Sequence, residues 1–312
     1  MRAFIFPGQG SQSVGMGASL AEASRTARDT FDMVDEALGQ NLARLMRDGP
    51  EEELKLTENA QPAIMAHALA VYRVLTQDCG VDLGKAAQVA AGHSLGEYSA
   101  LCAAGAFDLA TTARLLRTRG LAMQAAVPVG EGAMAALLGA DVEVARRIAE
   151  AAAQGEVCEV ANDNDPSQVV ISGHFKPIMR AIELAKGMGA KRAIQLPVSA
   201  PFHCSLMKPA AEVMERALAK TTVARPAVPI YANVTASPDS DPEHIRSNLV
   251  AQVTGMVRWR ETIAAMAAAG VEEFVEIGGK VLAPMVKRIV PEMRVTSVVT
   301  LDEIEALAKE IA

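Results

Sequence analysis

The stretch Gln88-Val-Ala-Ala-Gly-His-Ser94-Leu-Gly-Glu-Tyr98 decides the fold of this chain. Residues 88–91 predict a short apolar strand, and the apolar residues from Tyr98 onward predict the start of a helix. A serine between two glycines at a strand-to-helix junction is the pattern of a nucleophile elbow, whose helix N-terminus can hold a developing oxyanion. An ordinary glycine-rich turn with a solvated serine is the alternative. The flanking strand and helix favour a nucleophile in an α/β fold.

Strand and helix signals also alternate on both sides of the elbow, as in α/β proteins. Residues 3–6 predict a first strand that ends at Pro7-Gly8-Gln9-Gly10. The predicted helices of this part cover residues 61–77, 111–126, 206–220, 258–269 and 281–289, and its later strands cover 228–231, 273–277 and 295–299.

The middle of the chain has a different order. Its predicted elements are a strand at 133–138, a helix at 141–153, strands at 157–161 and 168–172, a helix at 176–189 and a strand at 192–197. This β-α-β-β-α-β order is typical of a ferredoxin-like unit. We therefore expect residues 128–197 to be inserted between two parts of a larger domain, 1–127 and 198–312, with a ligand cleft between them.

Composition excludes several classes of protein. The net charge is −7, the pI is near 5.4, and no basic cluster suggests a nucleic-acid partner. No apolar run is long enough to span a membrane, and Pro7 interrupts the N-terminal apolar residues too early for a signal peptide. The four cysteines have neither paired nor metal-ligand spacing, so we expect reduced thiols, no metal site and a cytoplasmic location.

Five histidines compete to be the base that a serine nucleophile needs. His67 lies in an apolar helical run typical of a core, and the side chain of His93 diverges from that of its neighbour, the serine. His174 follows a turn of the middle unit, and His244 lies in a polar stretch. His203 remains, but no acidic residue is placed to orient it. Either a carbonyl group orients this histidine, or the hydrolase interpretation is wrong.

Arg119 is the second clue to function. It falls near the centre of the apolar face of the predicted helix 111–126, which is formed by Leu115, Leu116, Met123 and Ala126. An arginine that reaches the rim of a domain would explain the position equally well. A guanidinium on an apolar face otherwise needs a carboxylate partner. No acidic residue is close in sequence, so a substrate carboxylate is a candidate.

Five separated motifs now make a family recognisable. They are Phe6-Pro-Gly-Gln-Gly-Ser-Gln12, Gly92-His-Ser-Leu-Gly-Glu-Tyr98, Thr118-Arg-Gly120, Pro197-Val-Ser-Ala-Pro-Phe-His-Cys204 and Glu276-Ile-Gly278. The chain resembles, nearly from end to end, the malonyl-CoA:acyl carrier protein transacylases of type II fatty acid synthesis. The resemblance implies an α/β-hydrolase-like large subdomain with an inserted ferredoxin-like small subdomain. It also implies transfer of malonyl from malonyl-CoA to acyl carrier protein, with no cofactor beyond the CoA thioester substrate.

The resemblance also assigns the reacting groups. Ser94 is expected to accept the malonyl group as an ester, and His203 to act as general base and then general acid. Gln9 and Leu95 are expected to hold the oxyanion through their backbone N–H groups.

Further residues are assigned to substrate binding. Arg119 is expected to bind the malonyl carboxylate, and the main-chain carbonyl of Gln252 to orient the histidine. Asn162 matches an asparagine that lines the cleft. Phe202 is expected to crowd an α-methyl branch, although it could be a packing residue only.

The chain departs from the family pattern at two places. The usual Gly-Pro-Gly-Lys turn is shortened to Gly278-Gly-Lys280, and residues 253–259 lack the usual aromatic-Asn-Pro sequence. Basic candidates for docking an acidic carrier are Lys191, Arg192, Lys208, Lys287 and Arg288. The alternatives are a malonyl transferase of a malonate decarboxylase or polyketide pathway, a serine thioesterase or esterase, and a non-catalytic binding module.

Overall fold

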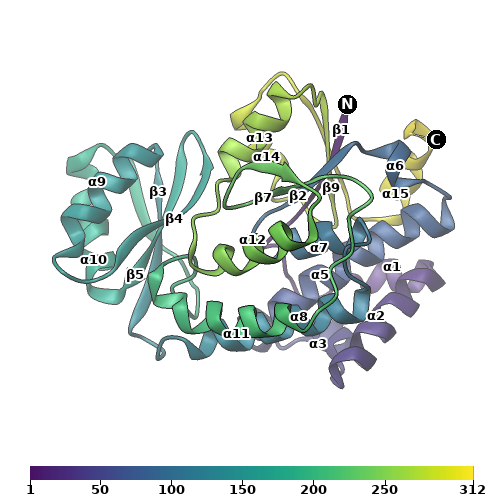
Figure 1. Ribbon diagram of the computed structural model, residues 1–312, viewed down its shortest axis with the longest axis horizontal. Coiled ribbons are helices and arrows are strands. Elements are labelled where there is room, and N and C mark those ends of the chain that lie inside the picture. The colour runs from purple at the N-terminus through teal and green to yellow at the C-terminus, as the bar shows by residue number, and fades with distance from the viewer. Residues whose placement is uncertain (312) are drawn as a thin grey trace.

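The computed structural model describes residues 1–311, which form a mixed α/β fold with two sheets (Figure 1). The larger sheet has six strands in the order β10-β9-β1-β2-β7-β8, parallel except for the β7–β8 pair. These strands are β1 (Arg2–Phe6), β2 (Val89–Gly92), β7 (Ile230–Ala232), β8 (Ser237–Asp239), β9 (Glu273–Ile277) and β10 (Arg294–Val298).

Helices cover both faces of this sheet, which agrees with the complete burial of residues 3–6 of β1. Phe4 and Phe6 belong to the core that the helices before and after the elbow complete, whereas Ala3 and Ile5 pack with α13 and α14. The helices that fix these two layers are α5 (Thr57–Arg73), α7 (Gly96–Ala103), α8 (Leu109–Ala125), α11 (Lys208–Ala219), α13 (Trp259–Ala268) and α14 (Ala283–Ile289). Every helix and strand predicted for this part of the chain is present, with ends shifted by a few residues.

The second sheet has four antiparallel strands in the order β4-β5-β3-β6. It lies at the left of Figure 1, with α9 and α10 on its outer face. Its elements are β3 (Gly132–Leu138), α9 (Val142–Ala153), β4 (Cys158–Asp165), β5 (Gln168–His174), α10 (Phe175–Ala185) and β6 (Arg192–Gln195). The predicted β-α-β-β-α-β order is confirmed. Ala135 packs against the helices, whereas Met134 and Ala136 on the other face join the core of the larger sheet.

Strand β4 joins the two sheets. The Asp163 N–H donates to the Val257 carbonyl and the Val257 N–H donates to Ala161, each at 2.9 Å. The buried carboxylates of Asp163 and Asp165 form ion pairs at 2.8 Å with Arg260 on α13 and Arg288 on α14, respectively. Because Val257 follows the predicted site residue Gln252 by five positions, the small sheet helps to hold this part of the site in place.

Several elements were not predicted from the sequence. They are the helices α1 (Ala18–Ala23), α2 (Arg25–Leu38), α3 (Leu42–Asp48), α4 (Glu51–Lys55), α6 (Leu83–Ala86), α12 (Pro242–Thr254) and α15 (Leu301–Ile311), together with β8. Helix α12 had a readable start, because Asp241 caps the N–H groups of Glu243 and His244 and Pro242 occupies the first turn. None of the helices in residues 1–311 combines the length and the apolar character that crossing a bilayer requires.

Candidate active site

Ser94 lies in the turn between β2 and α7, as the sequence predicts, with a backbone φ of +52°. The turn can close only around glycines. A Cβ on Gly92 would lie 1.9 Å from the backbone of Gly96, and a Cβ on Gly96 would lie 2.3 Å from the carbonyl oxygen of Phe6. Left-handed backbone is costly for a non-glycine residue and is typical of functional sites. The chain therefore fixes Ser94 by steric exclusion around it.

His203 contacts this serine. Its Nε2 lies 2.7 Å from Ser94 Oγ, while Nδ1 lies 2.9 Å from the Gln252 carbonyl oxygen and 3.2 Å from that of Gly255. A carbonyl only accepts hydrogen bonds, so Nδ1 carries the proton and Nε2 is free to accept from the serine hydroxyl. Burial and the nearby Arg119 charge lower the pKa of His203 to about 3, so the ring is neutral near pH 7. Two backbone carbonyls therefore orient His203 in place of an acidic side chain.

Within residues 1–311, the other histidines form no hydrogen bond with Ser94 Oγ. His93 Nε2 is 2.8 Å from Asn164 Oδ1, and its ring meets Trp259 edge-on. His67 is buried, which confirms its predicted core position. His174 accepts from the Val157 N–H, and His244 is exposed.

Arg119 is buried beside the serine, with 1% of its surface exposed. Its Nη2 lies 3.2 Å from Ser94 Oγ and 2.9 Å from Gln252 Oε1, and its Nη1 donates to Gln61 Oε1 at 2.8 Å. Within residues 1–311, no carboxylate oxygen lies within 4.0 Å of the guanidinium, and Nε has no hydrogen-bond partner. A buried cation that contacts only neutral groups is able to bind an anionic ligand.

Gln9 and Leu95 flank the serine from two elements. Leu95 precedes the first residue of α7, and Gln9 follows β1 in a loop pressed against the elbow, where a Cβ on Gly8 would lie 2.6 Å from the His93 carbonyl oxygen. The shortened turn supports this loop, since a Cβ on Gly279 would lie 2.8 Å from the Pro7 ring. Among the residues that the structure describes, neither the Gln9 nor the Leu95 N–H has a protein acceptor.

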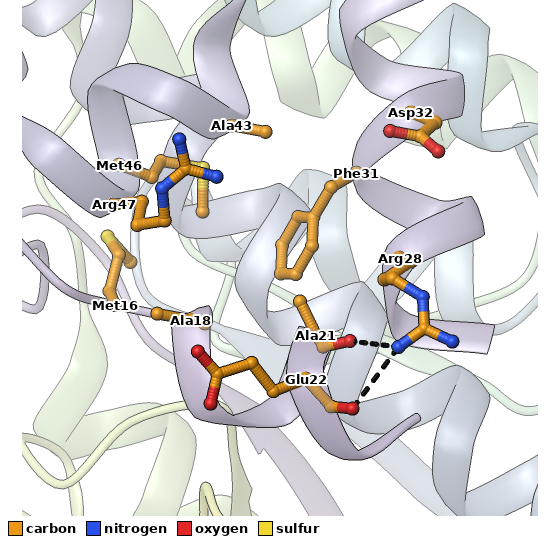
Figure 2. A pocket seen from close by; sticks show the side chains of 11 residues that line it. Met16, Ala18, Ala21, Glu22, Arg28, Phe31, Asp32, Ala43, Met46 and Arg47 are labelled. Carbon is orange, nitrogen blue, oxygen red and sulfur yellow. Dashed lines mark hydrogen bonds between the residues drawn. The ribbon is translucent and has the colours of Figure 1, made fainter. Parts of the chain in front are cut away.

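These groups meet in a cavity of about 400 Å³ between the two sheets. Of the predicted site residues, those that line it are Gln9, Ser94, Arg119, Asn162, Phe202 and His203. Leu95 and Gln252 are buried behind the wall. Met134 and Val170 from the small sheet complete the apolar lining. A different cavity of about 500 Å³ lies beside α1, α2 and α3, where Phe31 is central and Arg28 bonds to helix carbonyls (Figure 2). It contains none of the predicted site residues.

Sequence reasoning missed polar residues that hold the elbow and Arg119 in place. Asn233 accepts from the Ser94 N–H and donates to the Gly92 carbonyl, both at 2.7 Å, and so spans the elbow. Glu97, buried on α7, accepts from the Asn233 N–H at 3.0 Å and from Gln252 Nε2 at 2.7 Å. Gln61 holds the guanidinium, as described above. The only signal for Glu97 was a carboxylate in an otherwise apolar helix, and Asn233 gave none.

Comparison with known proteins agrees with this geometry. Residues 3–293 match the acyl transferase domain family. The malonyl CoA-acyl carrier protein transacylase of Escherichia coli K12 is 46% identical over 307 residues, which cover 98% of this chain and 97% of that protein.

Two solved structures are similar over their whole length. The acyl-carrier-protein-S-malonyltransferase of Bartonella henselae has a TM-score of 0.97 and 52% identity, with 99% of each chain covered. A malonyl-transacylase in complex with a type II polyketide synthase acyl-carrier protein has a TM-score of 0.95 and 41% identity, again with 99% of each chain covered. The chain combines a serine–histidine pair and a buried arginine with similarity over its whole length, and this protein therefore belongs to the malonyl-CoA–acyl carrier protein transacylase family.

Proposed function

We propose that this protein transfers malonyl from malonyl-CoA to the phosphopantetheine thiol of an acyl carrier protein, for fatty acid synthesis. One observation carries the choice of substrate. The Arg119 guanidinium is buried in the cavity wall beside Ser94 Oγ, and no carboxylate of residues 1–311 contacts it directly. An acyl group that ends in a carboxylate supplies the missing partner, while an acetyl group does not.

The serine and histidine carry the transfer. Ser94 Oγ attacks the thioester carbon as its proton moves to His203 Nε2, and the tetrahedral oxyanion accepts from the Gln9 and Leu95 N–H groups. The C–S bond then breaks, and the histidine returns the proton to the CoA sulfur. The carrier thiol repeats these steps in reverse on the malonyl-serine ester. The Gln252 and Gly255 carbonyls hold the imidazole in the required tautomer throughout.

The remaining cavity residues select the acyl group. Arg119 binds the free carboxylate of malonyl. Phe202 lines the cavity next to His203, where its bulk disfavours an α-methyl branch, and Asn162 lines the wall contributed by the small sheet. Because only malonyl has a carboxylate to bind, Arg119→Ala costs about 2–5 kcal/mol for malonyl transfer and little for acetyl transfer.

The division of the chain is part of the same proposal. We assign residues 1–127 and 198–312 to an α/β-hydrolase-like large subdomain, and residues 128–197 to a ferredoxin-like small subdomain. The parallel order of the six-stranded sheet and the antiparallel order β4-β5-β3-β6 support this division. We place the reaction in the cytoplasm, as the sequence leads us to expect.

Acyl carrier protein is the proposed partner, by analogy with the complex of the similar transacylase. The basic residues available for docking are fewer than the sequence suggests. Arg288 is paired with Asp165, and Lys287 Nζ donates to two backbone carbonyls. Lys191, Arg192 and Lys208 are exposed. Reversal of their charges raises KM for the carrier and leaves KM for malonyl-CoA unchanged.

Intact-protein mass spectrometry after brief mixing with malonyl-CoA or acetyl-CoA tests the function. We expect a strong malonyl adduct from malonyl-CoA and only a weak acetyl adduct from acetyl-CoA. The malonyl adduct should be absent from Ser94→Ala and present in the control Ser237→Ala, which changes an exposed serine. Turnover of Ser94→Ala should fall on the order of 10⁶-fold. Malonyl-CoA consumption without an adduct would indicate a thioesterase. An inert protein would indicate a binding module, and an adduct that fatty-acid carriers cannot discharge would indicate a malonate decarboxylase or polyketide pathway.

A further inference from the structure

We propose that Glu97 is a positioning residue that offsets the Arg119 charge through the Gln252 amide and takes up a proton when a substrate carboxylate reaches Arg119. The inference rests on the proposed function, since it concerns the carboxylate of malonyl. It assigns a part in substrate selection to a residue that does not line the cavity.

The contacts form a continuous chain from carboxylate to guanidinium. Glu97 Oε2 accepts from Gln252 Nε2 at 2.7 Å, and the Oε1 of the same amide accepts from Arg119 Nη2 at 2.9 Å. The Gln252 Nε2 also donates to the Ser94 carbonyl at 3.0 Å. With both of these acceptors facing Nε2, the amide cannot flip without losing them, so its oxygen is kept toward Arg119.

The separation of the two charges matters for binding. A carboxylate in direct contact with Arg119 would occupy the donors that a substrate needs. Held one amide away, Glu97 stabilises the buried cation in the empty enzyme and leaves the guanidinium next to Ser94 Oγ open to the cavity. When malonyl binds, two carboxylates share one cation at short range in a buried site, and their repulsion favours protonation of one of them.

Glu97 is the member of this pair that can take the proton. Burial raises its pKa to about 7, against the opposing effect of its two hydrogen-bond donors and of Arg119. The elements packed around it contribute neutral amides from Asn233 and Gln252, the cation Arg119 from α8, and Tyr98 from its own helix. Burial raises the pKa of the Tyr98 phenol, so it stays neutral in this range. The second carboxylate therefore shifts the pKa of Glu97 further upward.

Proton uptake by the wild-type enzyme tests the inference directly. Acylation exchanges a thioester for an ester and releases CoA chiefly as the thiol, so the chemistry itself leaves the proton balance almost unchanged at pH 7.5. We expect uptake of about half a proton per malonyl-enzyme at pH 7.5, for an upward shift of about one pH unit. The measurement uses a dye in weak buffer, with adduct formation followed by mass spectrometry and acylation by acetyl-CoA as the reference.

Glu97→Gln is the matched variant, because its amide oxygen can still accept both hydrogen bonds while carrying no charge. It should show no proton uptake, and its preference for malonyl over acetyl should rise roughly fivefold at pH 8 and no longer depend on pH between 6 and 8. The effect should vanish in an Arg119→Ala background. Glu150→Gln, which removes an exposed charge on α9, should behave as the wild type.

The outcomes separate the two proposals. No malonyl adduct on Ser94 would overturn the proposed function. A normal adduct with no proton uptake by the wild type would overturn only the assignment of Glu97. Wild-type selectivity of Glu97→Gln at every pH would do the same, and would reduce Glu97 to a hydrogen-bond acceptor. Because the uptake measurement needs no variant, the inference stays testable even where Glu97→Gln does not fold.

Discussion

The elbow and strand β4 face each other across the cavity, and they are held in place in opposite ways. The elbow is shaped by exclusion, since Gly92 and Gly96 leave no room for a side chain. Strand β4 is fixed by polar side chains that cross to the larger sheet, including Asp163 to Arg260 and Asn164 to His93. Steric exclusion requires particular small residues within a short stretch of sequence, whereas a polar contact can be made by many residue pairs far apart in sequence.

The strongest way to break this comparison is Gly92→Ala. The added methyl would lie 1.9 Å from the backbone of Gly96, so either the elbow opens or the strand moves. We expect the free energy of unfolding to fall by about 3 kcal/mol or more and transfer activity to drop below about 1%. Urea denaturation and the adduct assay measure both. Gly187→Ala is the control, because a Cβ there meets nothing within 4 Å. A stable, active Gly92→Ala protein would show that the elbow is not fixed by exclusion.

Acid should act chiefly on the part of the molecule that contains the elbow. Burial lowers the pKa of His67 to about 4 and of His203 to about 3, and lowers that of His93. Unfolded histidines bind protons below about pH 6.5 while these buried ones do not, so stability is present above that pH and is lost below it. The raised pKa of Glu97 has the opposite effect, because the folded protein binds the extra proton between about pH 4.5 and 7. This stabilisation on acidification offsets the loss caused by one histidine.

The net expectation is a loss of about 3 kcal/mol in the free energy of unfolding between pH 7 and pH 5. Urea denaturation at each pH measures it. His67→Gln should reduce the slope by about one proton, and His244→Gln, at an exposed position, should leave it unchanged. A stability independent of pH in this range would mean that the three rings are charged in the folded protein.

Asp163→Ala tests the β4 side of the comparison. It leaves Arg260, which is one-third exposed, without its buried partner and loosens the bridge to Val257. We expect a loss of about 2 kcal/mol in stability, less than for a fully buried pair because water reaches the guanidinium. The value of kcat should also fall, because Val257 follows the carbonyls that orient His203. Asp302→Ala, at an exposed helix start, is the control. An unchanged kcat would show that this contact of β4 stabilises the fold without affecting catalysis.

Glu159→Gln should give the smallest effect. Glu159 on β4 accepts from the Ser205 N–H at 2.9 Å and from its hydroxyl at 2.6 Å, two residues beyond His203. The amide keeps one acceptor oxygen, so we expect a loss of about 0.7 kcal/mol, seen as a threefold lower kcat at constant KM. A larger effect than that of Asp163→Ala would reverse the ranking of these β4 contacts.

The same contrast explains which features could be predicted from the sequence. The elbow, both sheets and the convergence of Ser94, His203 and Arg119 follow from local patterns and separated motifs. Asn233 spans the elbow from 139 residues away, and no local period indicates such a partner. Helix α12 carried an N-terminal capping signal that the sequence prediction did not use. The same holds for α2, in which buried residues recur at helical spacing between the Ser24 cap and Gly39.

The left-handed backbone at Ser94 has a consequence for how this fold can change over evolutionary time. At a φ of +52°, a side chain branched at Cβ is strongly disfavoured. Substitution of Ser94 by threonine during evolution is therefore disfavoured, although the threonine hydroxyl would be chemically competent as a nucleophile. Cysteine remains open, as an unbranched side chain of similar shape. The backbone at the elbow therefore tolerates replacement of the nucleophilic oxygen by sulfur, but not one additional methyl group on Cβ.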